Sequence, residues 1–204
     1  MNNIKAVVFD FAGVIELNDS GNPMIAIAKA VGVPLEDFKK EYFKYNHLSN
    51  VGNMKWEDMI LKVANVFGLT EKIKKEISAI IDDLESRRVI NAELVAMFPV
   101  LRQQGFKVAI FSNNNSELRE RLIETKIIEL IDEAIISAEI GFQKPHLEAF
   151  EVLFKKLNVQ PAEVVFIDDT AKSLEKASEI GYTPILFESN EQLKSDLEKL
   201  GIKF

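Results

Sequence analysis

The 204-residue sequence predicts an α/β fold in which a parallel β-sheet is covered by helices on both faces and a block of helices is inserted after the first strand. A continuous apolar run at residues 4–9, rich in valine, is typical of a strand that is buried on both faces. Residues 18–88 then contain only amphipathic segments, whereas apolar and amphipathic segments alternate after them. We therefore expect a three-layer α/β core of residues 1–17 and 89–204 and an inserted helical cap of residues 18–88.

The expected cap contains four segments with apolar residues at three- and four-residue spacing, separated by glycine, proline and asparagine. These segments predict four helices at 21–32, 34–46, 55–68 and 70–88. In the core, Gly105 is expected to end one helix, and Pro145 is expected in the first turn of another. Beginning with a helix, we expect helices and strands in alternation at 91–105, 107–113, 116–126, 132–141, 145–159, 162–169, 170–181, 183–189 and 190–201.

Composition and charge exclude several classes of function. The formal net charge of −7 argues against a broad basic face for nucleic acid or for an anionic membrane. The absence of cysteine excludes disulfides and thiolate metal sites. No apolar run reaches the roughly 18 residues that a membrane span needs, and the N-terminal apolar run is too short for a signal peptide. We therefore expect a cytoplasmic monomer or homodimer that binds neither nucleic acid nor membrane.

Polar residues follow three of the predicted strands at the point where each strand ends. Asp10 follows the first strand, Ser112 and Asn113 end the next, and Asp168 and Asp169 end a later one. Taken singly, each of them could be an ordinary turn or helix-capping residue. Ligands in open α/β sheets, however, bind beyond the carboxyl ends of the strands. We therefore expect these side chains to converge on one crevice.

The combination of these residues points to phosphoryl transfer. Up to three carboxylates at adjacent strand ends repel one another, and a hard divalent cation such as Mg²⁺ would relieve that repulsion. Lys144 and the pair Ser112 and Asn113 suit a phosphoryl group, whose negative charge is spread over its oxygens. A carboxylate nucleophile, a metal, a lysine and small hydrogen-bond donors together make a complete phosphoryl-transfer site.

The order of these motifs resembles that of the haloacid dehalogenase (HAD) superfamily over nearly the whole chain. VVFDFAGV is similar to the first motif of that family, IFSNN to the second, Lys144-Pro145 to the third and VVFIDD to the fourth. The resemblance implies a Rossmann-like core, and the helical block with its GNMKWEDMI stretch resembles the small C1-type cap. Within the superfamily, the chain most resembles the sugar-phosphatase-like members and the N-terminal phosphatase domain of soluble epoxide hydrolase.

The resemblance also implies a role for each site residue. Asp10 would attack phosphorus and form an aspartyl-phosphate, while Lys144 would neutralise the nucleophile and the transferring group. Ser112 and Asn113 would hydrogen-bond the phosphoryl oxygens. Gly13 would permit a close backbone turn beneath the phosphate. The implied reaction is the Mg²⁺-dependent hydrolysis of a small phosphorylated metabolite, with sugar phosphates among the candidates.

The metal site implied by the resemblance contains Asp10, Asp169, the backbone carbonyl of Ala12, and Asp168 as a ligand or through water. Ala12 departs from the family pattern, because most members carry a second aspartate there as the acid and base of the reaction. Three explanations stay open. Ala12 is a native variant in which water or substrate carries the proton, or it marks an enzyme similar to phosphonoacetaldehyde hydrolases, or it is a deliberate replacement.

Three other functions stay open beside that of a phosphatase. In a haloacid hydrolase, Asp10 would attack a carbon atom of the substrate, and an arginine would be needed to bind the substrate carboxylate. Arg87 and Arg88 are the nearest candidates for that arginine. A catalytically weak or silent protein that binds phosphate or metal is favoured by Ala12 alone. A phosphonate hydrolase would need a Schiff-base lysine from the cap. The candidates for that lysine are Lys29, Lys39, Lys40, Lys44, Lys55 and Lys62.

Overall fold

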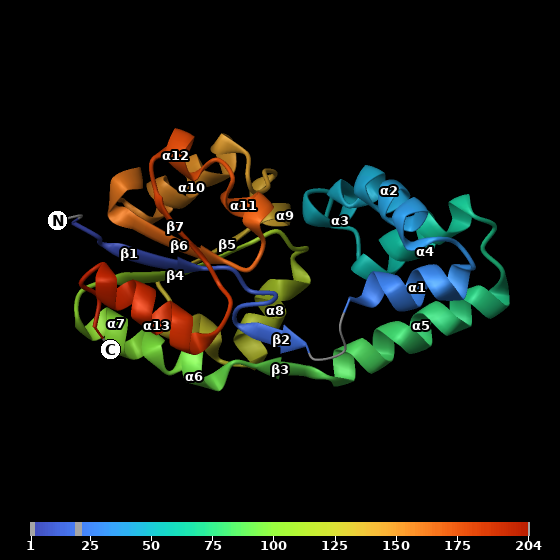
Figure 1. Cartoon of the computed structure of the whole chain (residues 1–204), viewed down its shortest axis with the longest axis horizontal. Coiled ribbons are helices and arrows are strands. Elements are labelled where there is room, and N and C mark those ends of the chain that lie inside the picture. Colours follow the sequence, from blue (N-terminus) through green and yellow to red (C-terminus); the bar gives the residue numbers. More distant parts are fainter. Residues whose placement is uncertain (1–2, 19–21, 204) are drawn as a thin grey trace.

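The computed structural model describes residues 3–18 and 22–203 and contains a five-stranded sheet in the order β5-β4-β1-β6-β7 (Figure 1). Every neighbouring pair of strands in this sheet is parallel, as predicted. Residues 1–2, 19–21 and 204 of the predicted domain ranges lie outside the described residues. The strands of the sheet are β1 (Ala6–Phe9), β4 (Lys107–Ser112), β5 (Glu133–Ile136), β6 (Val164–Asp168) and β7 (Thr183–Leu186).

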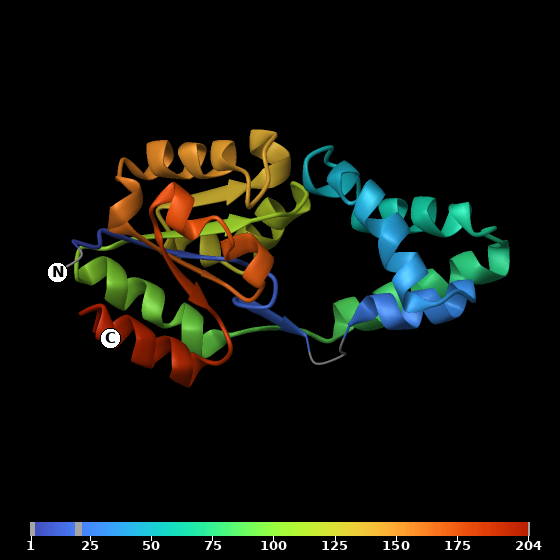
Figure 2. The same cartoon turned by 45° about the horizontal axis from the view of Figure 1, so that its top comes forward.

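Helices cover both faces of the sheet (Figure 2). These helices are α6 (Ala92–Val95), α7 (Met97–Gln103), α8 (Glu117–Glu124), α10 (Leu147–Leu157), α12 (Ala177–Ile180) and α13 (Asn190–Lys199). Val7 and Phe9 of β1 pack into a hydrophobic core with α6, α7, α8 and α13, whereas Ala6 and Val8 pack into another with α10 and α12. The alternation of side chains along β1 therefore builds the predicted three layers, with the first strand at the centre.

The described part of the inserted segment folds into five helices, where the sequence predicted four. They bury a hydrophobic core of their own, which includes Phe38, Met59 and Ile77. The additional helix is one turn within a polar stretch, where no apolar periodicity could reveal it. The five helices are α1 (Pro23–Val31), α2 (Leu35–Tyr45), α3 (His47–Asn50), α4 (Trp56–Val66) and α5 (Glu71–Ser86).

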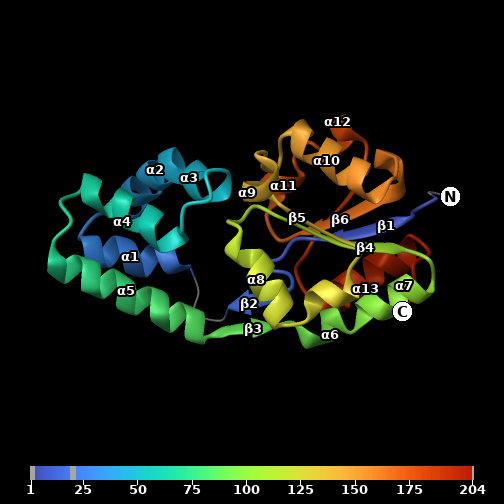
Figure 3. The same cartoon turned by 180° about the vertical axis from the view of Figure 1, so that it is seen from behind.

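An antiparallel ribbon that the sequence did not predict joins this helical segment to the core. Its strands are β2 (Glu16–Asn18) and β3 (Arg88–Ile90), which pair along their whole length. Figure 3 shows α5 running directly into β3, with β2 beside it. Strands of three residues are too short to show an alternating pattern, so the sequence carried no signal for them. The ribbon lies where we placed the domain boundaries, which remain a prediction.

Two predicted core elements have different limits in the structure. The strand predicted from residue 132 ends at Ile136, and its second half forms the short helix α9 (Ser137–Ile140). The helix predicted from Pro145 begins at Leu147, so Pro145 precedes the helix instead of lying in its first turn. At the end of β5 the apolar pattern continues across the junction, and such short runs do not distinguish a strand from a turn of helix. Before α10, the backbone of His146 is extended, with φ of −68° and ψ of 137°, so the helix begins only at Leu147.

Two predicted helices are interrupted. The helix predicted at 91–105 breaks at Ala96, consistent with Pro99, which has no N–H to donate to the carbonyl of Val95. The helix predicted at 170–181 divides into α11 (Ala171–Leu174) and α12. Within the described ranges, none of the helices is both long enough and apolar enough to span a membrane.

Candidate active site

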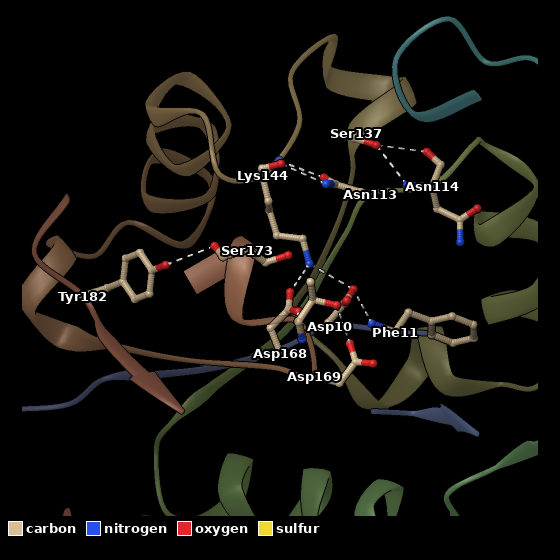
Figure 4. Close-up of polar contacts among 11 residues, drawn as sticks. Asp10, Phe11, Asn113, Asn114, Ser137, Lys144, Asp168, Asp169, Ser173 and Tyr182 are labelled. Carbon is tan, nitrogen blue, oxygen red and sulfur yellow. Dashed lines mark hydrogen bonds and ion pairs between the residues drawn. The ribbon is translucent and has the colours of Figure 1, made fainter. Parts of the chain in front are cut away.

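The carboxyl ends of the three central strands bring the predicted site residues to one edge of the sheet. β4, β1 and β6 are neighbours, so Ser112, Asp10 and Asp168, which end or follow these strands, lie side by side. Asp169 continues from β6, and Lys144 comes from the loop before α10. Figure 4 shows the side chain of Lys144 pointing toward the three aspartates. The structure thus brings together residues that are far apart in the sequence.

Lys144 lies buried at the centre of this arrangement. Its Nζ is 3.1 Å from Oδ1 of Asp10 and donates a 2.6 Å hydrogen bond to Oδ2 of Asp168. The ring centroids of Phe166 and Phe111 also lie 4.9 and 5.5 Å from Nζ. Two carboxylates and two aromatic faces therefore compensate the desolvation that burial imposes on the ammonium group.

Asp168 is the buried partner that fixes the position of the Lys144 ammonium group. It is fully buried, and both of its carboxylate oxygens have partners, since Oδ1 accepts a 2.8 Å hydrogen bond from the N–H of Thr170. Burial raises the pKa of Asp168 to about 6, and the negative charge of Asp10 adds to the increase, although Lys144 opposes it. Because its oxygens are already occupied, Asp168 acts first as the residue that orients the lysine.

Asp169 lies at the exposed rim of the site, with its carboxyl packed against Gly13. Because of this packing, desolvation raises the pKa of Asp169 even though the residue as a whole is exposed, and Asp10 raises it further. One ligand atom each from Asp10, Asp168 and Asp169 lies within 4.8 Å of the other two. Three carboxylate oxygens in so small a space fit a hard cation such as Mg²⁺, which prefers oxygen ligands.

The two carboxylate oxygens of Asp10 differ in their surroundings. Oδ1 accepts a 2.7 Å hydrogen bond from the N–H of Phe11 and lies beside Lys144. No hydrogen bond from a described residue reaches Oδ2. Asp10 itself is 9% exposed, so a ligand at the edge of the sheet can still contact the carboxylate. Oδ2 is therefore the oxygen that the fold leaves available for an incoming group.

Gly13 is required by the close approach of Asp169. Its backbone has φ of 83°, which is the left-handed region, and an added Cβ would lie 2.1 Å from Oδ2 of Asp169. The predicted close turn is therefore present, and the group that approaches it in the structure is the Asp169 carboxylate. A phosphate contact at this turn remains a prediction.

The substitution Gly13→Ala is expected to lower the free energy of unfolding by about 3 kcal/mol, because backbone strain of about 1–2 kcal/mol adds to the clash with Asp169. If Mg²⁺ binds the three carboxylates, the substitution is also expected to abolish the rise in melting temperature that the ion would cause, because it displaces Asp169. Gly32→Ala is the matched control, because Gly32 has φ of 82° and nothing within 4 Å of the added Cβ. Equal losses in the two variants, with the Mg²⁺ effect intact, would contradict this reading of Gly13.

Ser112 and Asn113 lie at the edge of the sheet but are engaged differently. The Asn113 side chain pairs with the backbone of Lys144, since its Oδ1 accepts from the Lys144 N–H at 2.8 Å and its Nδ2 donates to the Lys144 carbonyl at 3.0 Å. One amide hydrogen remains for an anion, so the first task of Asn113 is to hold the lysine loop. Ser112 is buried at the end of β4, and its predicted contact with a phosphoryl oxygen remains a prediction.

Sequence reasoning missed two groups of this site. Thr170 donates its N–H to Asp168 and its hydroxyl to Oδ1 of Asp169, the latter at 3.2 Å, and so orients both carboxylates. Its position directly after the two aspartates was the available signal. The aromatic rings of Phe111 and Phe166 beside Lys144 gave no such signal, because a continuous apolar run is expected in any strand that is buried on both faces.

The cap lysines do not support a Schiff-base mechanism. Of the candidates, Lys55 pairs with a core residue, Glu117, at 3.0 Å, and this ion pair raises the pKa of Lys55. A Schiff-base amine needs a lowered pKa, so the shift has the wrong direction. Lys39 and Lys44 pair with acidic residues of their own helix. In the part of the chain that the structure describes, no contact joins a cap lysine to Asp10 or its neighbours.

The two arginines proposed for a haloacid substrate are also engaged elsewhere. Arg87 pairs with Asp83 at 2.9 Å, and Arg88 lies 3.6 Å from Glu16 in the ribbon that joins cap and core. Glu16 also accepts two hydrogen bonds from Arg121 of α8, at 3.0 and 2.9 Å. The charges of both arginines are matched by acidic residues of α5 and of the ribbon, so none of these contacts favours binding of a substrate carboxylate at the strand ends.

Comparison with known proteins agrees with this geometry. A family profile described as haloacid dehalogenase-like hydrolase matches residues 4–181. Phosphatase MT3486 of Mycobacterium tuberculosis is 26% identical over 222 residues, which cover 98% of this chain and 96% of that protein. Bifunctional epoxide hydrolase 2 of Rattus norvegicus is 29% identical over 129 residues, which cover 61% of this chain. The matched region spans only 23% of that rat protein.

Among solved structures, a HAD family enzyme of Bacteroides thetaiotaomicron, bt-2542, has a TM-score of 0.71 at 20% identity and covers 98% of this chain, which in turn covers 100% of that structure. The same enzyme is also known in complex with magnesium and inorganic phosphate, with a TM-score of 0.65. The Rossmann-like α/β fold implied by the motifs is therefore confirmed. Because the family profile matches most of the sequence, this protein belongs to the haloacid dehalogenase-like hydrolase family.

Proposed function

We propose that this hydrolase is a Mg²⁺-dependent phosphatase that acts on small phosphomonoesters, sugar phosphates among them, through an aspartyl-phosphate on Asp10. The observation that carries the proposal is the buried Lys144 ammonium beside Asp10, at the edge where three carboxylates meet. The name of the Mycobacterium relative, a phosphatase, and the magnesium and phosphate of the bt-2542 complex support it. We also propose that residues 18–88 form the cap that selects the substrate.

In the proposed first step, Oδ2 of Asp10 attacks phosphorus and forms the aspartyl-phosphate. The bond between phosphorus and the leaving-group oxygen breaks, and that oxygen keeps the electron pair. Lys144 stabilises the negative charge of the transferring group, and its ion pair with Asp168 keeps it in place. Ser112 is proposed to donate its hydroxyl to a phosphoryl oxygen.

The donor set at this edge fits Mg²⁺, and we propose that Asp10, Asp169 and the carbonyl of Ala12 would hold it, with Asp168 as a ligand or through water. When bound, the ion would neutralise charge on the phosphoryl oxygens. Gly13 keeps the backbone beside Asp169 close to that carboxylate. The pKa values of Asp168 and Asp169 are raised by burial and by the negative charge of Asp10. A bound cation would relieve the repulsion between these carboxylates.

The second step is hydrolysis of the aspartyl-phosphate by water, which regenerates Asp10 and releases phosphate. Ala12 has no group that can transfer a proton, so neither the leaving group nor the attacking water receives help from this position. We therefore propose that a proton for the leaving group comes from water or from the substrate. Esters with good leaving groups should react best, since they need little protonation.

Removal of Mg²⁺ with a chelator is expected to lower the hydrolysis of 4-nitrophenyl phosphate by about 10²-fold or more, because the ion contributes several kcal/mol of charge stabilisation. Added Mg²⁺ is also expected to raise the melting temperature of the protein, because the ion binds only the folded carboxylate cluster. Phosphate release and thermal unfolding measure the two effects separately.

Asp169→Asn is the matched variant for both measurements, because it removes one ligand charge at the exposed rim and leaves the buried pair of Lys144 and Asp168 intact. It should abolish the thermal shift with Mg²⁺. The metal assignment would be refuted if the protein hydrolysed the ester equally well without Mg²⁺ and if added Mg²⁺ did not change its melting temperature.

A phosphate- or metal-binding protein without turnover is the second candidate, and Ala12 is the observation that favours it. Phosphate release from an aryl ester distinguishes the two candidate functions. A silent protein binds inorganic phosphate and Mg²⁺ in calorimetry but releases no phosphate from 4-nitrophenyl phosphate, whereas the proposed phosphatase releases it with Ala12 in place.

A further inference from the structure

The cap contacts the core just beyond the carboxyl ends of strands of the main sheet. Asn53 accepts hydrogen bonds from the N–H and the hydroxyl of Ser116, at 2.8 and 2.7 Å. Ser137, which directly follows β5, donates its hydroxyl to the backbone carbonyl of Asn50. Figure 1 shows α2 and α3 of the cap facing α9 and α11 of the core. The cap therefore lies against the edge of the sheet that carries the three aspartates.

A third contact, on the helix that follows β6, is of a different kind. Lys172 of α11, three residues beyond Asp169, has its Nζ 5.8 Å from the ring centroid of Phe43 on α2. Phe43 is 59% exposed, and its ring meets that of Tyr42 edge-on at a centroid distance of 5.5 Å. A cation–π contact between two exposed groups is weak, so a ligand can displace it easily.

Lys172 also differs from the other lysine at the cap–core contact in its partners. Lys55 is paired with Glu117, whereas Lys172 forms no ion pair with any described residue. Its ammonium group lies on an aromatic face in a protein with a formal net charge of −7. An anionic ligand could therefore take this ammonium group without breaking an ion pair of the protein.

We propose that Lys172 and Phe43 bind the leaving group of the substrate, and that the preferred substrates are phosphomonoesters whose leaving group carries an apolar, aromatic surface and a second anionic group such as a carboxylate. This inference rests on the proposed phosphatase function. The Phe43 ring offers an apolar face to the leaving group, and the Lys172 ammonium pairs with its anion. The two residues come from the cap and from the core, so such a leaving group contacts both.

The test compares two substrates that differ by one carboxylate, phenyl phosphate and 4-carboxyphenyl phosphate, on the full chain with Mg²⁺. We expect Lys172→Gln to lower kcat/KM for 4-carboxyphenyl phosphate roughly fivefold, as for the loss of an exposed ion pair, and to leave phenyl phosphate within about twofold. Lys172→Arg should restore the preference. Because both substrates are measured on every variant, their different leaving-group reactivities cancel when the substrate ratio of a variant is divided by that of the wild type.

Two further variants separate the contributions. Lys75→Gln removes the same charge from an exposed position on α5 and should leave the ratio of the two substrates unchanged. Phe43→Ala should raise KM for both aryl esters and leave kcat within about twofold, because the ring contacts the leaving group and not the phosphoryl group. Phe43 is exposed, so this variant is expected to fold.

The outcomes distinguish a failure of the leaving-group assignment from a failure of the proposed phosphatase function. If Lys172→Gln lowers kcat/KM equally for both substrates, or for neither of them, the leaving-group assignment is overturned. The phosphatase proposal still stands in that case, as long as Asp10→Asn is inactive. If Asp10→Asn hydrolyses both esters at the wild-type rate, the proposed function itself fails. A Lys75→Gln variant with the same change of ratio would show a general effect of charge and would also overturn the assignment.

Discussion

Asp10→Asn is expected to lower the hydrolysis of 4-nitrophenyl phosphate on the order of 10⁴-fold or more, because an amide cannot take the phosphoryl group as a carboxylate does. The protein should still fold, since Lys144 keeps its 2.6 Å contact with Asp168 and the β1 backbone is unchanged. Phosphate release measures the rate. Intact-protein mass after acid quenching measures the phosphoenzyme, which should be present in the wild type and absent in the variant.

Asp82→Asn provides the control for this experiment, because it makes the same change of side chain at an exposed position of α5. It should retain wild-type activity and show the same phosphoenzyme. A fully active Asp10→Asn protein would remove Asp10 as the nucleophile. An inactive Asp10→Asn protein that still acquires phosphate would place the covalent intermediate on another residue.

Ala12→Asp is expected to raise kcat for alkyl phosphates by about 10²- to 10⁴-fold, the usual contribution of a positioned general acid and base. Ala12 is exposed, so a carboxylate at this position does not have to be buried. The gain should be small for 4-nitrophenyl phosphate, whose leaving group needs little protonation. Steady-state rates with an alkyl and an aryl ester measure the difference.

Ala12→Asn is the matched control, because it has nearly the same shape as aspartate and cannot transfer a proton at neutral pH. Rapid mixing adds a second criterion. The wild type should show a burst of 4-nitrophenol as phosphoenzyme accumulates, and Ala12→Asp should remove the burst by accelerating hydrolysis of the intermediate. An equal gain in kcat from Ala12→Asn, or no gain from Ala12→Asp, would contradict the view that the missing acid and base limits the rate of hydrolysis.

Much of the core was predictable from local pattern. β1, β4 and β6 contain continuous apolar runs with a polar residue at or directly after the carboxyl end of each strand, and this signal depends only on residues adjacent in the chain. The parallel sheet and its covering helices follow from the alternation of such runs with amphipathic segments. The ribbon of β2 and β3 and the single turn of α3 were missed, because three- and four-residue elements are too short to carry a period.

The roles of individual side chains were less predictable. The amide of Asn113 pairs with the backbone of Lys144, 31 residues away, which the sequence did not indicate, and its expected contact with a phosphoryl oxygen stays a prediction. For Gly13, the structure adds a contact that the sequence did not indicate, because its missing side chain makes room for the Asp169 carboxylate, while the expected phosphate contact stays a prediction. A motif identifies which residues belong to a site, but their partners depend on contacts across the sheet.

The sequence by itself determined the α/β class, the positions of Asp10, Asp168 and Asp169 at strand ends, and the alanine at position 12, because residue identity and hydrophobic periodicity are local properties of the chain. Only the tertiary structure decided that Lys144 lies between Asp10 and Asp168, and that Phe43 of the cap meets Lys172 of the core. These pairs join segments that are distant in the chain. Their meeting depends on how the sheet orders its strands and on where the cap packs, neither of which a local pattern encodes.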